Sequence, residues 1–127
     1  MKSINEIYTM LDWNQPIEIQ RQGIDCAKNT GLLHPFIQPM DSKFNKNIWE
    51  NCSIIVCSKN DTKLQEVLVL LMEWVQDLNW PGAINVLERL RKYNKNACFY
   101  TVYNECINKA ERNGDVVWKE NLQSIVK

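Results

Sequence analysis

The chain has 127 residues, a length typical of one domain with a substantial hydrophobic core. Its 15 Lys and Arg side chains balance 15 Asp and Glu, so the formal charge is zero. Non-specific binding to DNA or RNA draws most of its affinity from cations against phosphate, and this neutrality therefore argues against a general nucleic-acid binder. We expect a single domain over residues 1–127 with no nucleic-acid partner.

The cysteines and the N-terminus indicate the compartment. There are five cysteines, an odd number, and no apolar leader-like segment precedes them. The longest apolar run, Val67 to Met72, is far too short to span a membrane. We expect a cytoplasmic protein with reduced thiols and no membrane partner.

The first predicted elements are two short helices joined by a corner that contains a tryptophan. Ser3 and Glu6 form a capping-box pattern before an apolar stripe, which predicts a helix over residues 4–11. A second helix is predicted over residues 17–29, with Gly31 just past its end. Its buried face is expected to carry Ile17, Ile24 and Ala27.

The middle of the chain is less regular. Residues 32–47 are predicted to hold no more than a helical turn or two and a polar loop from Asp41 to Asn47. A helix follows over residues 48–58. A long central helix is then predicted to run to about Leu78, with Asp61 or Thr62 as its cap, because apolar residues recur on one face at helical spacing.

The last third reads as three further helices. Asn79 is the expected N-cap of the first of these, with Pro81 in its first turn. After a turn at residues 94–96, an apolar stripe predicts a helix over residues 99–110, and Asp115 is expected to cap the last helix. In the helix that follows Pro81, the expected apolar stripe is Ala83, Ile84, Leu87 and Leu90. No segment has the alternation of a strand.

Four tryptophans recur at similar places in this helical pattern. Trp13, Trp49, Trp80 and Trp118 are separated by 36, 31 and 38 residues, each near the start of the second helix of a predicted pair. The alternative is a coincidence among five tryptophans. The pattern favours an all-α fold, an α-α superhelix (a HEAT- or armadillo-like solenoid) of about four helix pairs.

The central corner carries a resemblance. Residues 73–81, Glu-Trp-Val-Gln-Asp-Leu-Asn-Trp-Pro, resemble the WxQDxNWP hallmark of an uncharacterised bacterial family of small HEAT-like helical proteins. More loosely, the chain is similar in helical layout to HEAT-like immunity proteins of toxin systems. The resemblance implies an α-α superhelix and a protein partner, and it implies no catalytic residue.

The reactive side chains do not form a recognisable catalytic or metal-binding pattern. His34 is the single histidine and has no cysteine or acid at ligand spacing. The cysteines lack the paired CxxC spacing of zinc and redox sites. A basic cluster between Arg89 and Lys95 is better explained by the C-terminal end of a helix than by a phosphate site. We therefore expect no enzyme activity, no catalytic residue, no metal and no cofactor.

Glu73 and Asp77 are the polar pair of most interest. They are four residues apart, so on one helix both carboxylates would share a face and could act as an acid/base pair. The alternative, which we favour, is that they build the corner together with Asn79, Trp80 and Pro81. Paired carboxylates need a cleft and a perturbed pKa for chemistry, and a sequence shows neither.

Two functions remain open at this stage. The first is a protein-binding helical-repeat module, and more specifically an immunity protein that neutralises a bacterial toxin. The alternative is a small enzyme or ligand binder that uses Glu73 and Asp77. In the first case the partner is expected to contact the solvent-facing positions of the second helices, Glu18, Asp25, Glu50, Glu88 and Arg89. The pattern says nothing about the oligomeric state.

Overall fold

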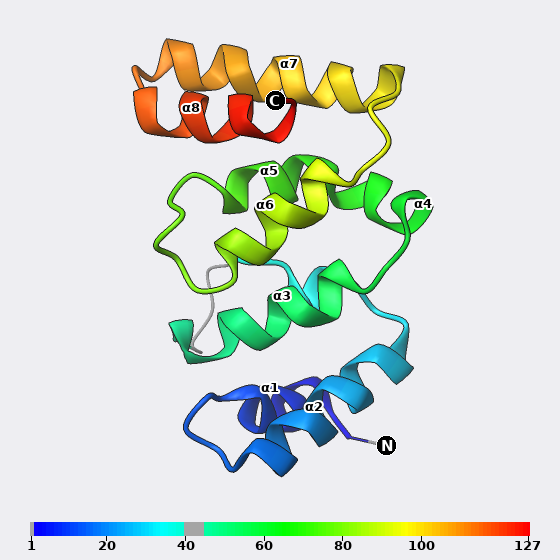
Figure 1. Cartoon of the computed structure of the whole chain (residues 1–127). Helices are drawn as coiled ribbons and strands as arrows, with labels where there is room; N and C mark the ends of the chain where they lie inside the picture. The colour runs from blue at the N-terminus through cyan, green and yellow to red at the C-terminus, as the bar shows by residue number, and fades with distance from the viewer. Residues whose placement is uncertain (1, 40–44) are drawn as a thin grey trace.

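The structure, a computed structural model, describes residues 2–39 and 45–127 (Figure 1). Helices, turns and loops account for these residues, and no strand occurs among them. The all-α prediction is therefore confirmed. Most of the polar loop predicted at residues 41–47 lies outside the described residues.

Successive helices form layers along the molecule (Figure 1). The first layer contains α1 (Ile4–Leu11) and α2 (Ile17–Thr30). The next contains the 3-10 turns η1 (His34–Phe36) and η2 (Lys46–Ile48) and helix α3 (Trp49–Cys57). The third contains α4 (Asp61–Leu64), η3 (Gln65–Val67), α5 (Leu68–Trp74) and α6 (Ala83–Arg91). The last contains α7 (Ala97–Arg112) and α8 (Val116–Ile125).

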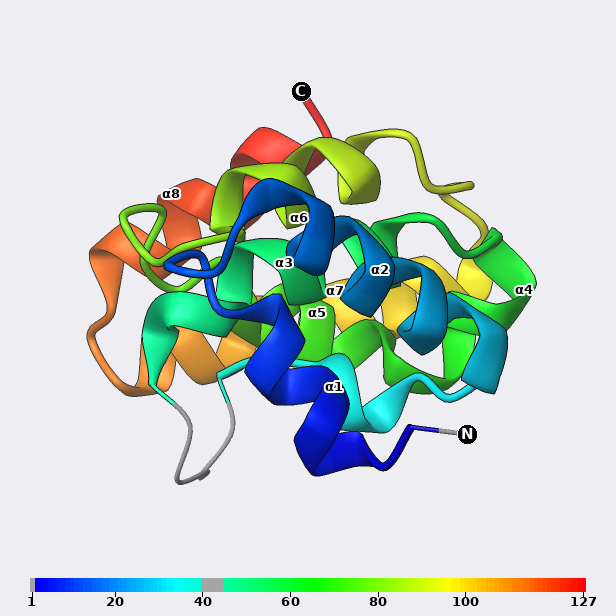
Figure 2. The same ribbon diagram turned by 90° about the horizontal axis from the view of Figure 1, so that it is seen from below.

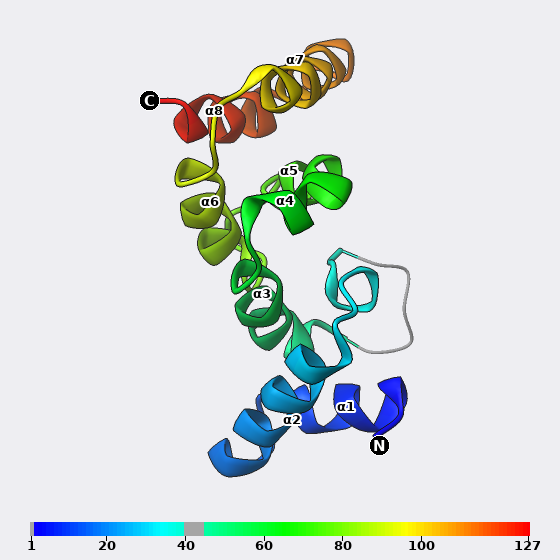
Figure 3. The ribbon, with the colours of Figure 1, turned by 90° about the vertical axis from the view of Figure 1, so that its right-hand side faces the viewer.

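The helices also divide into two sides. Figures 2 and 3 show α2, α3, α6 and α8 on one side and α1, α5 and α7 on the other. Within the first set, α2 packs on α3, α3 on α6, and α6 on α8; we call this set the second-helix column. The core lies between the two sides and is built from side chains with almost no exposed surface, among them Leu11, Ile55, Leu68, Trp74, Leu90 and Phe99. No described helix combines the length and apolar character needed to cross a membrane.

The N-terminal pair matches its prediction except at one position. Ser3 and Glu6 make the reciprocal capping box, and Gly31 ends α2 with a left-handed φ of 69°. The expectation that Ile17 is buried is wrong, because its side chain is 57% exposed. α1 and α2 approach each other closely at Gly23, where an added Cβ would lie 2.8 Å from that of Met10.

The long central helix is broken into α4, η3 and α5, so that prediction is wrong. Its cap is neither Asp61 nor Thr62. The side chain of Asn60 accepts the amide of Lys63 at 2.9 Å. At Val67 the backbone leaves the helical region, with φ −123° and ψ 15°, which separates α4 and η3 from α5.

Helix α5 ends at Trp74, well before Leu78, because side chains of α8 occupy the carbonyl groups at its end. The indole of Trp118 donates to the carbonyl of Met72 and the amide of Asn121 donates to the carbonyl of Val75, each at 2.9 Å. The last carbonyls of a helix have no partner within the helix, so these contacts stabilise the end where it stands.

The corner after α5 also differs from the prediction. The N-cap of α6 is Gly82 in a left-handed conformation with φ 83°, and Asn79 lies in the turn before it. The stripe is shifted as well: Ile84 is 52% exposed and Val86 is buried in its place. By contrast, Asp115 caps α8 as predicted, accepting the amide of Trp118 at 3.0 Å.

Candidate functional site

A groove of about 410 Å³ lies on the exposed side of the second-helix column. We call it the column groove. Three helices build it, so its residues are far apart in the sequence. Its lining comprises Lys28 from α2, Ile54, Cys57 and Ser58 from the end of α3, and Asn85, Glu88, Arg89 and Lys92 from α6.

One wall of the column groove is fixed by an ion pair. Arg89 donates to the Asp61 carboxylate at 2.6 Å and to the carbonyl of Lys59 at 3.0 Å, and only 16% of its side chain is exposed. The same carboxylate accepts the amide of Asn94 at 3.0 Å. Partial burial raises the pKa of Asp61, but the hydrogen bonds from Arg89 and Asn94 outweigh it and hold that pKa below its ordinary value.

The floor of the groove is held by contacts between α3 and α6. The carboxylate of Glu50 accepts the backbone amide of Gly82 and the side-chain amide of Asn85, which also donates to the hydroxyl of Ser53 at 2.9 Å. The thiol of Cys57 donates to the carbonyl of Asn85 at 3.6 Å. Burial raises the pKa of Cys57 to about 11, so its thiol is neutral near pH 7.

The remaining groups of the groove are available to a ligand. Lys28 and Lys92 have no ion-pair partner within the described part of the chain. Glu88 lies 3.8 Å from the guanidinium of Arg91, one turn along α6, and both side chains are well exposed. Ile54 lines the same groove and is 40% exposed. The groove therefore combines an apolar centre with two unpaired cations.

The predicted partner-binding residues differ in their exposure and in their contacts. Glu18 and Asp25 are exposed on α2, and Glu88 is exposed on α6. Glu50 is engaged by α6 rather than free for a partner. Arg89, expected to point away from the core, lines the column groove, but only 16% of its side chain is exposed and it is paired with Asp61.

Sequence reasoning missed Lys28, Ile54 and Lys92 as a group. Lys92 belonged to the basic cluster at the end of α6, which was assigned to the helix terminus. Nothing in the spacing of Lys28 and Ile54 indicates that they line one groove, because α2 and α3 meet only in the folded chain.

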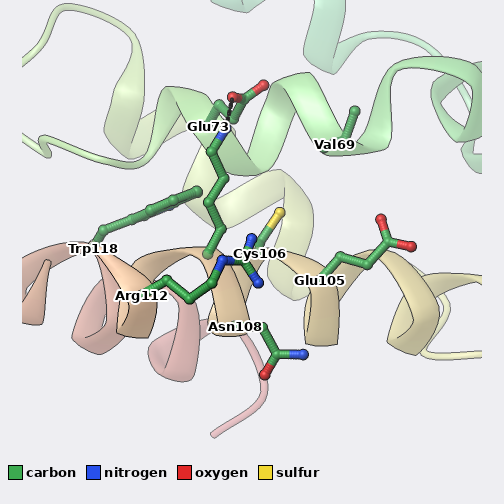
Figure 4. Close-up of a pocket in the computed structure, with 8 residues that line it drawn as sticks. Val69, Glu73, Glu105, Cys106, Asn108, Arg112 and Trp118 are labelled. Atoms are coloured by element: carbon green, nitrogen blue, oxygen red, sulfur yellow. Dashed lines mark hydrogen bonds and ion pairs between the residues drawn. The ribbon is translucent and has the colours of Figure 1, made fainter. Parts of the chain in front are cut away.

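A second pocket, of about 340 Å³, lies between α5 and α7. Figure 4 shows Val69 and Glu73 on α5, with the Cys106 thiol and the Arg112 guanidinium of α7 below them in that view. The Glu73 carboxylate lies 3.4 Å from the ammonium group of Lys109 (dashed line in Figure 4). Glu105, Asn108 and Trp118 complete the lining.

The structure does not place Glu73 and Asp77 on one helix face, so that expectation is wrong. α5 ends at Trp74, and the carboxylate of Asp77 accepts the backbone amide of Asn79 at 2.8 Å in the turn that follows. Asp77 also does not line the pocket that contains Glu73. The two carboxylates therefore serve different local structures.

The other corner residues have packing contacts. The ring of Trp80 lies edge-on to that of Trp49, with centroids 5.8 Å apart. The carbonyl of Pro81 accepts the indole hydrogen of Trp74 at 3.2 Å. The Trp74–Pro81 contact and the Asp77–Asn79 turn lie within the corner between α5 and α6, and the Trp80–Trp49 contact packs this corner against α3.

The potential metal ligands are dispersed. Within residues 2–39 and 45–127, no group of three or more His, Cys, Asp and Glu side chains is placed to hold a metal ion. His34 is exposed in η1. Cys52 and Cys106 are buried and unpaired by disulfides, as their places on the apolar stripes predict.

The chain belongs to the family described as "Domain of unknown function (DUF5071)", whose model matches residues 41–127. This span begins before α3 and includes α6, and thus most of the column groove. No curated protein and no solved structure matches the chain.

Proposed function

We propose that residues 1–127 form one helical-repeat domain, an α-α superhelix that binds a protein partner through the exposed face of the second-helix column. One observation carries this proposal. Each helix of that column exposes a large aliphatic side chain, although α3 and α6 bury their other large aliphatic side chains. These side chains are Ile17 on α2, Ile54 on α3, Ile84 on α6 and Val117 on α8, which are 57%, 40%, 52% and 60% exposed.

The polar surroundings of these side chains support a binding role. Single exposed aliphatic residues are ordinary, but their recurrence on successive packed helices, with charged groups beside at least one of them, favours a binding surface. Ile54 lies in the column groove beside Lys28 and Glu88. Such a surface offers apolar contact together with charges that fix the register of a specific partner.

The partner that we propose is a bacterial toxin, which would make the chain an immunity protein. The similarity in helical layout to immunity proteins of toxin systems supports this step. Layered helix pairs present an extended side to a partner, as repeat proteins do. The proposed role is binding. In its support, the Glu73 carboxylate contacts Lys109 and the Asp77 carboxylate accepts the amide of Asn79, so the two carboxylates do not form the pair that the alternative function uses.

Co-purification with the product of the adjacent gene tests this proposal. The wild type is expected to retain that protein and to restore growth to cells that express it. Ile17→Glu and Ile84→Glu replace exposed aliphatic side chains of α2 and α6 with a charged one. Both variants should weaken retention while leaving the thermal midpoint nearly unchanged, because interfaces concentrate their energy in a few side chains.

Val69→Glu is the matched control, because Val69 is a 41% exposed aliphatic residue of α5, on the other side of the molecule. It should retain the partner as the wild type does. Normal retention by both column variants would contradict the proposed surface. Loss of retention in the control alone would favour the pocket between α5 and α7, which is where the alternative function, a ligand-binding site containing Glu73, would have to lie.

A further inference from the structure

We infer that the column groove receives an acidic segment of the partner, with an aliphatic side chain of that segment seated on Ile54 and carboxylates directed to Lys28 and Lys92. This inference rests on the proposed function and names the chemistry of the partner. It differs from the expectation from the sequence, in which four of the five contact residues were acidic: Glu18, Asp25, Glu50 and Glu88.

The charge of the groove favours an anionic group. The charge of Arg89 is matched by Asp61 at 2.6 Å, and that of Glu88 by Arg91 at 3.8 Å. The positive charge of the groove lining that has no such partner is therefore that of Lys28 and Lys92. Asp25 precedes Lys28 by about one turn of α2 but does not line the groove.

The thiol in the lining does not change this balance. Cys57 stays protonated near pH 7, because burial raises its pKa to about 11. The amide of Asn85 is engaged by Glu50 and Ser53. The two lysine ammonium groups are therefore the donors that a partner can reach without breaking an internal contact.

The shape and the apolar centre favour a protein segment over a polyanion. Ile54 is 40% exposed within the groove, and Ile84 is 52% exposed one turn before Glu88 on α6. A phosphate chain gains nothing from this aliphatic surface. A peptide that carries leucine or isoleucine beside glutamate or aspartate matches both the apolar and the cationic groups.

Two blocked helical peptides test the inference. One is built from leucine, alanine and glutamate, and its twin has lysine in place of every glutamate. Each is titrated into ¹⁵N-labelled full-length protein and followed by amide chemical shifts and by fluorescence anisotropy. The acidic peptide should shift the amides of Ile54, Ser58 and Asn85, and its lysine twin should not.

The double variant Lys28→Glu/Lys92→Glu should bind the acidic peptide with an affinity at least about tenfold lower than that of the wild type. It should also bind the lysine twin, which the wild type does not. The control is Lys2→Glu/Lys127→Glu, which makes the same change in net charge at exposed lysines outside the groove. It should bind the acidic peptide about as well as the wild type. Equal weakening in both double variants would show attraction by bulk charge and overturn the inference.

Equal binding of both peptides, shifts that map outside the groove, or no binding of the acidic peptide would also overturn it. The proposed function can fail separately. If the wild type retains the adjacent gene product but no peptide shifts the groove, the binding role stands and the acidic segment is wrong. If the acidic peptide behaves as expected but no protein partner is retained, the groove chemistry stands and the proposed partner is wrong.

Discussion

Asp61 connects the start of α4 to α6 and to the turn that follows α6. It accepts hydrogen bonds from Arg89 of α6 and from the amide of Asn94, and its backbone carbonyl accepts the hydroxyl of Tyr93 at 3.2 Å. Asp61→Asn removes the charge with little change in shape. We expect a loss of about 1–2 kcal/mol of unfolding free energy, because hydrogen bonds to charged groups are strong but these are partly exposed.

The pH dependence of that loss follows from the lowered pKa of Asp61. A carboxylate whose pKa is lower in the folded state stabilises the fold above its unfolded pKa, ordinarily 3.8, and loses this effect as the pH falls through the folded pKa. The difference between wild type and Asp61→Asn should thus be constant above about pH 5 and shrink in more acidic solution. Urea titrations at several pH values measure it, with the exposed Asp25→Asn as control. A difference that grew on acidification would contradict the account.

The cysteines should react in the order of their exposure. Burial raises the pKa of Cys52 to about 12 and that of Cys106 to about 11, so neither presents a thiolate near pH 8. Cys98 is exposed at the start of α7. Maleimide labelling followed by mass mapping should modify Cys98 first and the two buried thiols only on unfolding. Rapid labelling of either in the native protein would show that α3 or α7 packs differently.

Local signals in the sequence correctly predict the capping role of several residues. Ser3, Gly31 and Asp115 cap or end their helices as expected, because the hydrogen bonds involved lie within a few residues of each other in the chain. Asp61 was expected to cap a helix and instead binds Arg89 and Asn94. Its partners follow it by some thirty residues, so no local pattern contains them.

At the level of elements, the start of α6 depends on Gly82. Its φ is 83°, and an added Cβ would lie 2.8 Å from both the Trp49 carbonyl oxygen and the Ser53 Cβ of α3. Gly82→Ala should therefore cost about 2–4 kcal/mol of unfolding free energy, from the left-handed backbone and the overlap with α3.

Gly31→Ala is the matched control for this position. It has a similar φ of 69°, but nothing lies within 4 Å of an added Cβ. It should cost only about 1 kcal/mol, the backbone contribution alone. Chemical denaturation of both variants measures the difference, and equal losses would mean that α3 and α6 do not approach at Gly82.

The ends of the central helices show where prediction from sequence stops. Helical periodicity placed an apolar helix here, but its end at Trp74 depends on Trp118 and Asn121 of α8, which donate to the carbonyls of Met72 and Val75. The apolar pattern continues past Trp74, so it contains no sign of this end. The exposure of Ile84 could not be predicted for the same reason, because it depends on how α6 packs against α3, which is distant in the sequence.

For the whole molecule, the sequence predicts the helices and only part of the candidate site. The stripe of α6 correctly placed Glu88 toward solvent. The column groove needs α2, α3 and α6 side by side, and no spacing within one helix indicates that Lys28, Ile54 and Lys92 share it. The tryptophan repeat indicated layers of helix pairs, but it did not say which side chains of neighbouring layers meet.

The central claim is that partner binding uses the aliphatic side chains of the second-helix column. The most direct test compares Ile54→Ser/Ile84→Ser with Val69→Ser/Tyr100→Ser. Both pairs remove large exposed side chains, the first from α3 and α6 and the second from α5 and α7. Retention of the adjacent gene product is measured beside the thermal midpoint. We predict that the first pair loses retention, the second keeps it, and both midpoints stay near that of the wild type. Normal retention by the first pair, or loss confined to the second, would contradict the claim.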